Sequence, residues 1–338
     1  MKRNKAVSIL SVGCVSAMAL SLAACSSDGG DGDGGTTTFK IAFNQTDTHP
    51  QYVALDHLGD RIKERTDGRY DLEVFPNETL GGQKDTIELV QAGSIEFSMV
   101  AGSLLENFNP DFVVFNLPYT FDSQEHQRAT VNDPEITGDL FASIEDQNIS
   151  VLAGFHGGVR SVYNSEKPIN TPDDLAGMKI RVIESDTNIE MMKLMGGSGT
   201  PMGQGEVYTA IQSGVLTGAE NNESIYANLK HAEIAKYYSY TRHLMFPDYL
   251  IVNPATMDAL SEEDRAVFTE EIAAALDEEA ELWVDEVVKS KAAAEEAGAI
   301  FNEVDADAFR EALEPLIEQK VTSDVARTLY DKVRAAAE

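Results

Sequence analysis

The sequence predicts an α/β protein of two lobes braced by long C-terminal helices. Strand and helix patterns alternate from residue 39 to 100, the alternation restarts near residue 149, and an Ala/Glu-rich amphipathic stretch follows Ser261. A length of 338 residues and a hydrophobic fraction of 43% agree with two lobes that have real cores. We therefore expect residues 39–160 mainly in lobe 1, residues 161–252 mainly in lobe 2, and residues 253–338 in helices that pack on both lobes.

Lobe 1 begins with a β-α-β-α-β pattern. Residues 39–43 (FKIAF), 70–75 (YDLEVF) and 95–100 predict strands, and helical patterns fill the two intervals, at about 53–62 and 83–91. Strands joined by helical crossovers form parallel sheets, so a parallel sheet with covering helices is expected. A buried apolar segment at 112–119 and acidic helices up to about 147 complete this part of the chain.

The alternation of strands and helices restarts near residue 149, at the end of lobe 1, and continues through lobe 2. The expected strands are 149–155, 159–163, 178–182, a short one leading into 219–222, and strands that cross back over 237–252. The expected helices begin at Thr171-Pro172, run over 187–195, and end at Gly214 after a Gly-rich stretch. Ser261 is a good N-cap for one or two long helices that reach about Gly298.

The charge balance excludes several classes of partner. With 26 Lys and Arg against 57 Asp and Glu, the formal net charge is −31. Nucleic-acid binding needs clustered cations for phosphate contacts and is not expected. The acidic surface would also repel an anionic ligand unless a local cation outweighs it.

The first 38 residues are interpreted as an export signal and a tether. A cationic start is followed by an apolar stretch at 7–22 that is too short for a confident membrane span. Residues 22–25 (LAAC) resemble the lipobox of bacterial lipoproteins, which predicts a signal peptide at 1–24 and lipidation of Cys25; the alternative is a secretory leader with a chance Cys. Residues 26–38 contain only Ser, Asp, Gly and Thr, which is typical of a flexible tether. The expected location is extracytoplasmic, at the outer face of the cytoplasmic membrane.

Motifs for catalysis, cofactors or metals are not found. The sequence lacks the phosphate-loop, dinucleotide-binding, zinc-protease, serine-hydrolase and EF-hand patterns. Residues 196–199 (GGSG) lack the lysine of a phosphate loop and favour a plain connection. The six histidines show no short-range ligand spacing, and the two cysteines, Cys14 and Cys25, lie in the leader and at the lipidation site. We therefore expect no catalytic residue, no metal and no cofactor.

Two arginines stand out because cations are scarce in this chain. In residues 178–182 (MKIRV) the alternation places Arg181 opposite the apolar face, near the carboxyl end of its strand, where open α/β sheets bind ligands. Arg160 begins a strand after Gly157-Gly158, where small residues allow a ligand to approach. The alternative for both is an ordinary surface arginine.

The segments around these arginines resemble one family. Residues 160–163 (RSVY), 168–169 (PI), 172–175 (PDDL) and 177–182 (GMKIRV) are similar to the central signature of substrate-binding proteins of TRAP (tripartite ATP-independent periplasmic) transporters, of the C4-dicarboxylate-binding type. Further similarities lie, in order, at residues 48–50, 75–77, 80–81, 117–119, 200–202, 206–214 and 218–221. The resemblance spans about residues 39–252.

The resemblance implies a periplasmic-binding-protein-like (type II-like) fold with the ligand in a cleft between the lobes. It implies a receptor, not an enzyme, that delivers a small organic acid to the small and large subunits of a membrane permease. It assigns the ligand carboxylate to Arg181, with a second arginine at Arg160, a polar contact at Asn221 and a lobe 1 contact at Asn44. A guanidinium suits this task because it forms two parallel hydrogen bonds to a carboxylate. Glu220 is either a ligand contact or a residue that orients an arginine.

The ligand is expected to carry hydroxyl groups. Neutral hydrogen-bonding side chains are dense around the expected cleft, and buried polar groups need partners. The ligand-binding residues predicted in addition to those above are His49, Gln204 and Asn222. A uronate such as glucuronate or galacturonate fits best, and a C4-dicarboxylate or sialic acid is the alternative. A ligand sensor and a secreted enzyme acting on acidic sugars are the competing classes.

Overall fold

The structure is a computed structural model that describes residues 35–337. The predicted signal peptide and Cys25 lie outside these residues. The predicted tether does not extend to residue 38, because Thr37 and Thr38 already belong to the first strand, where they pair with Tyr70 and Asp71. That prediction is wrong at its C-terminal end: backbone pairing needs no core-forming side chain, and threonine favours strands.

One five-stranded sheet forms lobe 1, in the order β2-β1-β3-β10-β4. Strand β1 is parallel to β2 and β3, as the β-α-β-α-β pattern predicts, whereas β10 is antiparallel to β3 and β4. The sheet is therefore mixed, because β10 comes from much later in the chain. Its strands are β1 (Thr37–Ala42), β2 (Tyr70–Phe75), β3 (Phe97–Ala101), β4 (Ser150–His156) and β10 (Pro247–Val252).

A six-stranded sheet forms lobe 2, in the order β11-β9-β5-β8-β6-β7. Its centre alternates in direction, since β5 is antiparallel to both β8 and β9, while β6 is parallel to β7 and β8. The strands are β5 (Arg160–Asn164), β6 (Lys179–Val182), β7 (Ser198–Pro201), β8 (Gly218–Asn221), β9 (Tyr237–Leu244) and β11 (Ile300–Glu303).

Two strands were not expected from the sequence, β7 and β11. Strand β7 lies in the Gly-rich stretch and is recruited by its parallel register with β6, which pairs Arg181 with Thr200. Strand β11 lies in the region predicted as helical and pairs with β9, on the side opposite to β5. Both are short edge strands, so their side chains carry little periodic signal.

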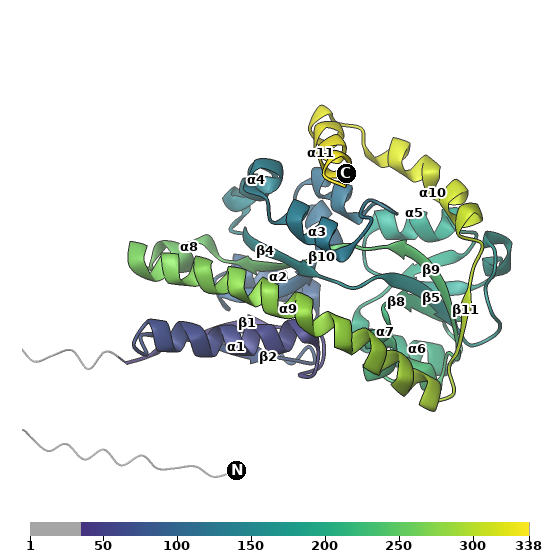
Figure 1. Ribbon diagram of the computed structural model, residues 1–338, viewed down its shortest axis with the longest axis horizontal. Helices are drawn as coiled ribbons and strands as arrows, with labels where there is room; N and C mark the ends of the chain where they lie inside the picture. The colour runs from purple at the N-terminus through teal and green to yellow at the C-terminus, as the bar shows by residue number, and fades with distance from the viewer. Residues whose placement is uncertain (1–34, 338) are drawn as a thin grey trace, which may run out of the picture. The chain divides into compact units, whose positions relative to one another are not determined.

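Lobe 1 is covered by helices on both faces of its sheet (Figure 1). Helix α1 begins with His49 as N-cap and Pro50 in the first turn, and it buries Leu55, Leu58 and Ile62. The predicted apolar segment at 112–119 forms a 3₁₀ helix and the turn after it. The helices are α1 (Pro50–Arg65), α2 (Gln83–Gln91), α3 (Gln124–Val131) and α4 (Pro134–Ala142), with 3₁₀ helices η1 (Gly102–Asn107), η2 (Pro110–Asn116) and η3 (Glu145–Gln147).

Lobe 2 has shorter helices. The helix start predicted at Thr171 is a single 3₁₀ turn, closed by a capping box between Thr171 and Asp174. The elements are η4 (Pro172–Leu175), α5 (Asp186–Leu194), η5 (Gln204–Glu206), α6 (Val207–Gln212), α7 (Glu223–Asn228) and η6 (His231–Glu233).

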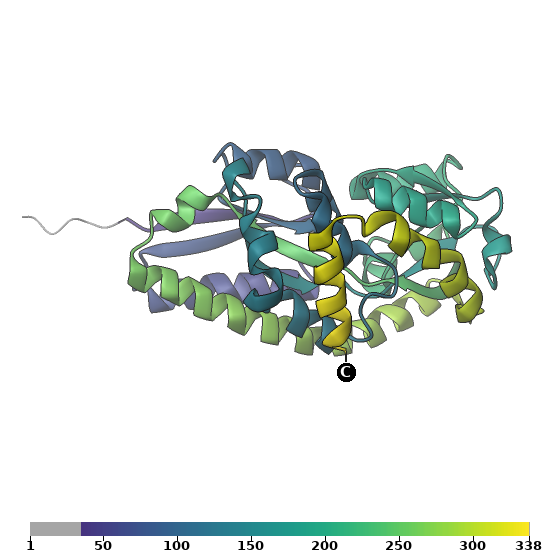
Figure 2. The same cartoon turned by 90° about the horizontal axis from the view of Figure 1, so that it is seen from above.

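One long helix connects the two lobes. Helix α9 (Glu262–Glu296) runs along both, as Figures 1 and 2 show. At one end Glu271 forms ion pairs with Arg61 and Arg65 of α1, and at the other Glu286 accepts a hydrogen bond from Ser224 of α7. The other C-terminal helices are α8 (Pro254–Asp258), α10 (Ala306–Lys320) and α11 (Asp324–Ala335). None of the helices in the described residues is long and apolar enough to cross a membrane.

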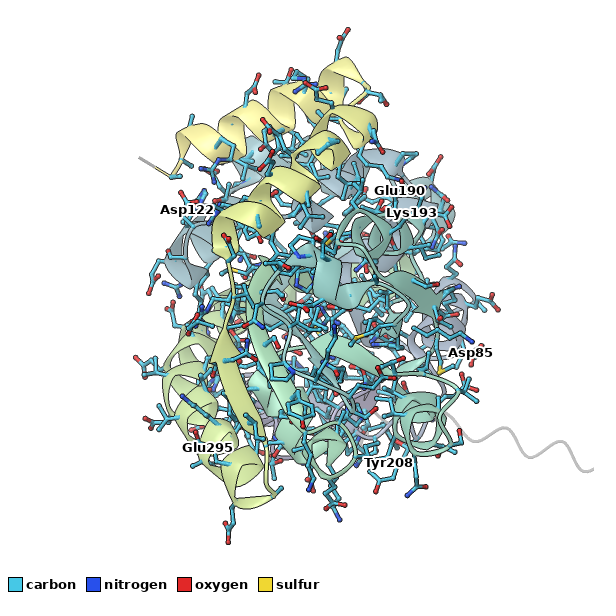
Figure 3. The ribbon with its side chains drawn as sticks, turned by 90° about the vertical axis from the view of Figure 1, so that its right-hand side faces the viewer. Asp85, Asp122, Glu190, Lys193, Tyr208 and Glu295 are labelled. Carbon is cyan, nitrogen blue, oxygen red and sulfur yellow. The ribbon has the colours of Figure 1, made fainter. Side chains whose placement is uncertain are left out.

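The acidic charge lies mainly at the surface. Asp85, Asp122 and Glu295 are exposed and lie at the outline of the view in Figure 3. Some charged side chains are nevertheless buried, among them Arg160, Arg181 and Glu220. A buried charge requires a specific explanation, because charged groups are stable inside a protein only when they are paired or hydrogen-bonded.

Candidate ligand-binding site

A small polar cavity lies where strands of both sheets end. Asn44 follows the carboxyl end of β1, and Ala101 ends β3; from the other sheet, Arg181 lies near the end of β6 and Asn221 ends β8. The side chains around it leave only about 20 Å³ open to the centre of a water molecule, so the cavity is narrow. Its position agrees with the rule that α/β sheets bind ligands at strand carboxyl ends.

Seven of the eight residues predicted to bind ligand line this one cavity. They are Asn44, His49, Arg160, Arg181, Gln204, Asn221 and Asn222. The eighth, Glu220, is buried beside the cavity and does not line it. These residues are separated by up to 178 positions in the chain, so the fold alone brings them together.

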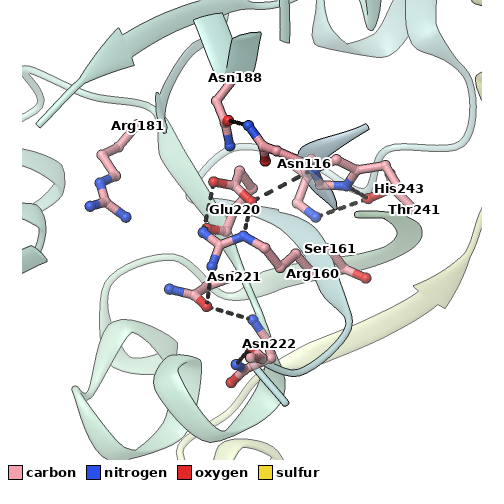
Figure 4. A network of polar contacts seen from close by, with 12 residues as sticks. Asn116, Arg160, Ser161, Arg181, Asn188, Glu220, Asn221, Asn222, Thr241 and His243 are labelled. Atoms are coloured by element: carbon pink, nitrogen blue, oxygen red, sulfur yellow. Dashed lines mark hydrogen bonds and ion pairs between the residues drawn. The ribbon is translucent and has the colours of Figure 1, made fainter. Parts of the chain in front are cut away.

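Arg160 is fully engaged inside the protein. Its Nε donates to Glu220 Oε2 at 2.6 Å and its Nη2 donates to Glu220 Oε1 at 2.8 Å, a bidentate ion pair. Its Nη1 donates to Asn221 Oδ1 at 2.9 Å, and the guanidinium lies over the Phe246 ring. Figure 4 shows this network around Arg160. Glu220 was predicted either to contact the ligand or to orient an arginine. Its contacts with Arg160 agree with the second role.

The ion pair keeps both groups charged despite their burial. Burial alone would lower the pKa of Arg160, but the charge and hydrogen bonds of Glu220 leave that pKa raised. Burial likewise opposes ionisation of Glu220, yet Arg160 and the nearby His243 bring the pKa of its carboxyl down to about 2. The pair is therefore neutral as a unit near pH 7.

Arg181 is buried without a carboxylate partner. Its Nε donates to the carbonyl oxygen of Met202 at 2.8 Å and its Nη1 donates to Gln204 Oε1 at 3.2 Å, and among the described residues it forms no ion pair. It is 4% exposed. Burial lowers the pKa of Arg181 to about 10, and the charge of Arg160 contributes to the decrease. It nevertheless remains a cation at pH 7, and Glu220 and Glu78 attract it without forming an ion pair with it.

Gln204 and Asn221 connect the two arginines. Gln204 Oε1 accepts from Arg181 and, at 3.4 Å, from Asn221 Nδ2, while Asn221 Oδ1 accepts from Arg160. Since the Gln204 oxygen faces two donors, its amide nitrogen faces away from them. That nitrogen is buried without a hydrogen-bond partner in the described residues.

Asn222 has a structural role in addition to its place in the lining. Its Oδ1 caps helix α7 by accepting from the Ile225 backbone N–H at 2.9 Å, and its Nδ2 donates to the Gly157 carbonyl at 2.9 Å. Gly158 has φ of +77°, and a Cβ there would lie 2.5 Å from Asn222 Nδ2. Gly158 is therefore required both for the turn and for the close packing of Asn222.

The lobe 1 side of the cavity contains neutral groups. Asn44 lines it directly. The His49 ring is 2% exposed, accepts the Gln51 backbone N–H on Nδ1 at 3.3 Å, and packs edge-on against Trp283. Burial lowers the pKa of His49 to about 3, and the nearby His156 contributes. His49 is thus a neutral imidazole at pH 7.

The lining also contains residues that the sequence reasoning did not select, Gln83, Phe246 and Asp248 among them. Asp248 is the most informative of these, because it is a carboxylate within the apolar run 244–252 (LMFPDYLIV). A lone acidic residue in a buried strand is a signal that could have been used. Gln83 carried no such signal, since it begins the predicted helix α2 and the sequence does not distinguish it from an ordinary polar residue on the exposed face of a helix.

The site is suited to binding. In the described residues no group of three or more His, Cys, Asp or Glu side chains could hold a metal ion. The lining contains one arginine without an ion-pair partner, one arginine paired with Glu220, several amides and the Asp248 carboxylate, and these groups provide hydrogen-bond donors and acceptors. A two-lobed α/β fold with such a cavity between two sheets defines a class of protein, the solute-binding receptors.

Comparison with known proteins gives the family. Residues 41–324 match DctP, the bacterial extracellular solute-binding proteins of family 7, and the chain belongs to this family. A solute-binding protein from Chromohalobacter salexigens is 38% identical over 276 residues, which cover 81% of this chain and 82% of that one. A family of solute-binding proteins confirms the prediction of an extracytoplasmic TRAP receptor and not an enzyme.

Solved structures confirm the fold. A TRAP periplasmic solute-binding protein from Anaerococcus prevotii, solved with bound α/β-D-glucuronate, has a TM-score of 0.86 and 38% identity, covering 89% of this chain and 98% of that one. A homologue from Xanthobacter autotrophicus, solved with bound β-D-galacturonate, has a TM-score of 0.84 and 33% identity, covering 88% and 99%. The predicted two-lobed fold is therefore correct.

Proposed function

We propose that this protein binds a hexuronate, D-glucuronate or D-galacturonate, as the solute receptor of a TRAP transporter. The observation that carries the proposal is Arg181, a buried cation without a carboxylate partner in a cavity lined by amides. A buried charge is stable only when it is paired. A ligand carboxylate supplies the missing partner.

The sugar part of the ligand follows from the rest of the cavity and from the solved homologues. Amide side chains can both donate to and accept from hydroxyl groups. Several structures that resemble this chain at 28–38% identity were solved with glucuronate or galacturonate. These two sources of support are independent, because one concerns this chain's own residues and the other its relatives.

The roles of the residues follow from their contacts. Arg181 binds the ligand carboxylate, and Asn221 assists from the end of β8. Arg160 donates to Asn221 and holds it in place, and Glu220 orients Arg160. A second group of residues lines the cavity wall. In this group Asn44 and Gln204 contact the hydroxyl groups, whereas His49 and Asn222 shape the wall, because their acceptors cap helices.

Titration calorimetry on residues 26–338 tests this function. D-glucuronate or D-galacturonate should bind, and D-glucose, which lacks the carboxylate, should not. Binding of succinate or N-acetylneuraminate without binding of either uronate would contradict the proposal and support the corresponding alternative. A thermal-shift screen gives a second readout, since ligand at 100 times its Kd adds about 2.7 kcal/mol of stability.

We also propose that Cys25 carries a lipid that holds the receptor at the outer face of the cytoplasmic membrane, from which it delivers its ligand to the small and large permease subunits. The support is the LAAC sequence at 22–25 and the Ser/Asp/Gly/Thr stretch after it. The Cys25→Ala variant should appear in the soluble fraction with unchanged ligand affinity. Membrane retention of that variant would contradict lipid anchoring at this residue.

A further inference from the structure

The cavity contains a second charged group, which the carboxylate-binding role of Arg181 does not explain. Asp248 lies on β10, opposite Ala101 of β3 and Phe155 of β4, and its side chain lines the cavity. Strand β10 belongs to the lobe 1 sheet, whereas Arg181 belongs to the lobe 2 sheet. A ligand bound by Arg181 from lobe 2 therefore meets Asp248 from lobe 1.

Asp248 has no cationic partner of its own. Its Oδ2 accepts a hydrogen bond from Gln51 Nε2 at 2.8 Å, and it forms no ion pair within the described residues. Arg160 is near enough to attract it electrostatically, but the Arg160 side chain is already bound to Glu220 and Asn221. Gln51 is itself fixed, because its Nε2 also donates to the His156 carbonyl at 3.0 Å. The second carboxylate oxygen of Asp248 thus has no protein donor assigned to it.

The space beside Asp248 is kept open by a glycine. A Cβ at Gly157 would lie 2.7 Å from the Phe246 carbonyl oxygen and 3.4 Å from Asp248 Oδ2. A larger residue at this position would collide with the Phe246 carbonyl oxygen and would contact the carboxylate. Gly157 and Asp248 both line the cavity, so the wall next to the carboxylate is backbone without a side chain.

Two further atoms of the lining have unused hydrogen-bonding capacity. Gln45 Oε1 and Gln204 Nε2 are buried without a partner in the part of the chain that the structure describes. The first is an acceptor and the second a donor, and both residues line the cavity. Buried polar atoms are normally satisfied, so an orphaned acceptor and donor in a binding cavity indicate ligand groups that can do both, as hydroxyls can.

We propose that Asp248 is the residue that selects polyhydroxy monocarboxylates over dicarboxylates. An ionised carboxylate accepts hydrogen bonds and donates none, so it binds ligand hydroxyl groups and repels a second ligand carboxylate. Gln51 acts as a positioning residue, which holds Asp248 from outside the cavity. The inference rests on the proposed uronate function and adds to it the reason why an acid with a second carboxylate is rejected.

The test compares D-glucuronate with D-glucarate, which carries a second carboxylate in place of the sugar carbonyl. Wild-type protein should prefer D-glucuronate. In Asp248→Asn the D-glucuronate affinity should fall by roughly 10- to 150-fold, since a charge-assisted hydrogen bond contributes about 1.5–3 kcal/mol. The D-glucarate affinity should stay equal or rise, because the repulsion is removed. Titration calorimetry gives both affinities.

Two other variants separate specificity from a loss of structure. Asp258→Asn makes the same chemical change at a side chain that is 77% exposed on α8, and it should leave both affinities unchanged. Gln51→Leu keeps the Asp248 charge but removes its support, so D-glucuronate should bind more weakly while D-glucarate is still rejected. This variant also keeps the proposal testable if Asp248→Asn does not fold.

The outcomes distinguish this inference from the proposed function. If wild-type protein binds no uronate, the proposed function fails. If wild-type protein binds D-glucuronate, the proposed function stands. The specificity role of Asp248 is then overturned if Asp248→Asn lowers the affinities for D-glucuronate and D-glucarate by the same factor, or if it changes neither affinity.

Discussion

Arg160 and Arg181 lie in the same sheet, on β5 and β6, with β8 between them, yet their surroundings differ completely. Arg160 forms a bidentate ion pair with Glu220 and a further bond to Asn221, whereas Arg181 bonds to one backbone carbonyl and one amide. Both are almost fully buried, at 3% and 4% exposure. The difference teaches that burial of a cation does not reveal its role; the presence or absence of an internal counter-charge does.

The same distinction separates the other residues of the site. Asn222 and His49 use their acceptors inside the protein, as helix caps. Gln45, Gln204 and Asp248 keep part of their hydrogen-bonding capacity unused. Substitutions in the first group should act mainly on stability, and substitutions in the second group mainly on binding.

The largest effect is expected for Glu220→Gln, which leaves Arg160 buried without its counter-charge. Removing one partner of a buried ion pair destabilises proteins by about 3–5 kcal/mol. Urea unfolding measures this change. The matched control is Glu303→Gln, which breaks a pair with Arg242 in which the two side chains are 69% and 49% exposed; such pairs contribute about 0–1 kcal/mol. An equal decrease in unfolding free energy in both variants would contradict the conclusion that Arg160 depends on Glu220 as an internal counter-charge.

The next effect concerns Arg181 and should appear in binding. Arg181→Lys keeps the charge but loses the two parallel donors, so uronate affinity should fall by roughly 10- to 150-fold. Arg181→Ala should lose more, because the ligand carboxylate would be buried without a cation. The stability of the ligand-free protein should change little, since within the described residues Arg181 forms two hydrogen bonds and no ion pair.

Titration calorimetry and urea unfolding on the same samples check the two halves of the Arg181 prediction. Arg265→Lys, at an arginine whose side chain is 47% exposed on α9, serves as the control and should match wild type. Affinity close to wild type in Arg181→Ala would contradict the carboxylate-binding role.

The third prediction uses pH to test His49. The pKa of His49 is lowered from 6.5 in the unfolded chain to about 3 in the folded protein. Between pH 6.5 and pH 3 the unfolded chain therefore binds a proton at His49, whereas the folded protein does not. The folded protein therefore loses stability as the pH falls from 6.5 towards 3. At pH 5 this loss is about 2 kcal/mol, because one pKa unit corresponds to about 1.4 kcal/mol.

His49→Asn isolates that contribution. Asparagine keeps an N-cap acceptor but does not titrate. The decrease in unfolding free energy between pH 7 and pH 5, measured without ligand, should be smaller in this variant than in wild type. An unchanged decrease would show that His49 does not contribute to the acid sensitivity.

The smallest effect is expected for Asn222. Loss of its helix cap in Asn222→Ala should lower stability by about 1 kcal/mol. Asn222→Asp keeps the capping oxygen but loses the donor to Gly157, so the two variants separate the two bonds. A much larger change in ligand affinity than in stability would move Asn222 to the group of residues with unused capacity.

The sequence by itself determined the order of the early elements and the selection of Arg181, the arginine that we propose binds the ligand carboxylate. Strand β2 and helix α2 match their predicted ranges, because alternation over 70–75 and a bounded helical pattern over 83–91 are local signals. Arg181 could be selected because a cation opposite the apolar face of a strand is rare in a chain of net charge −31.

The tertiary structure decided everything that depends on contacts between distant segments. Strand β10 crosses into the lobe 1 sheet and carries Asp248 into the cavity, and β7 and β11 exist only because an edge strand was available to pair with them. The contrast between Arg160 and Arg181 belongs here too, since Glu220 is 60 residues from Arg160 in the chain. Local periodicity records which face of an element is buried, but it contains no information about which charge will lie opposite another after folding.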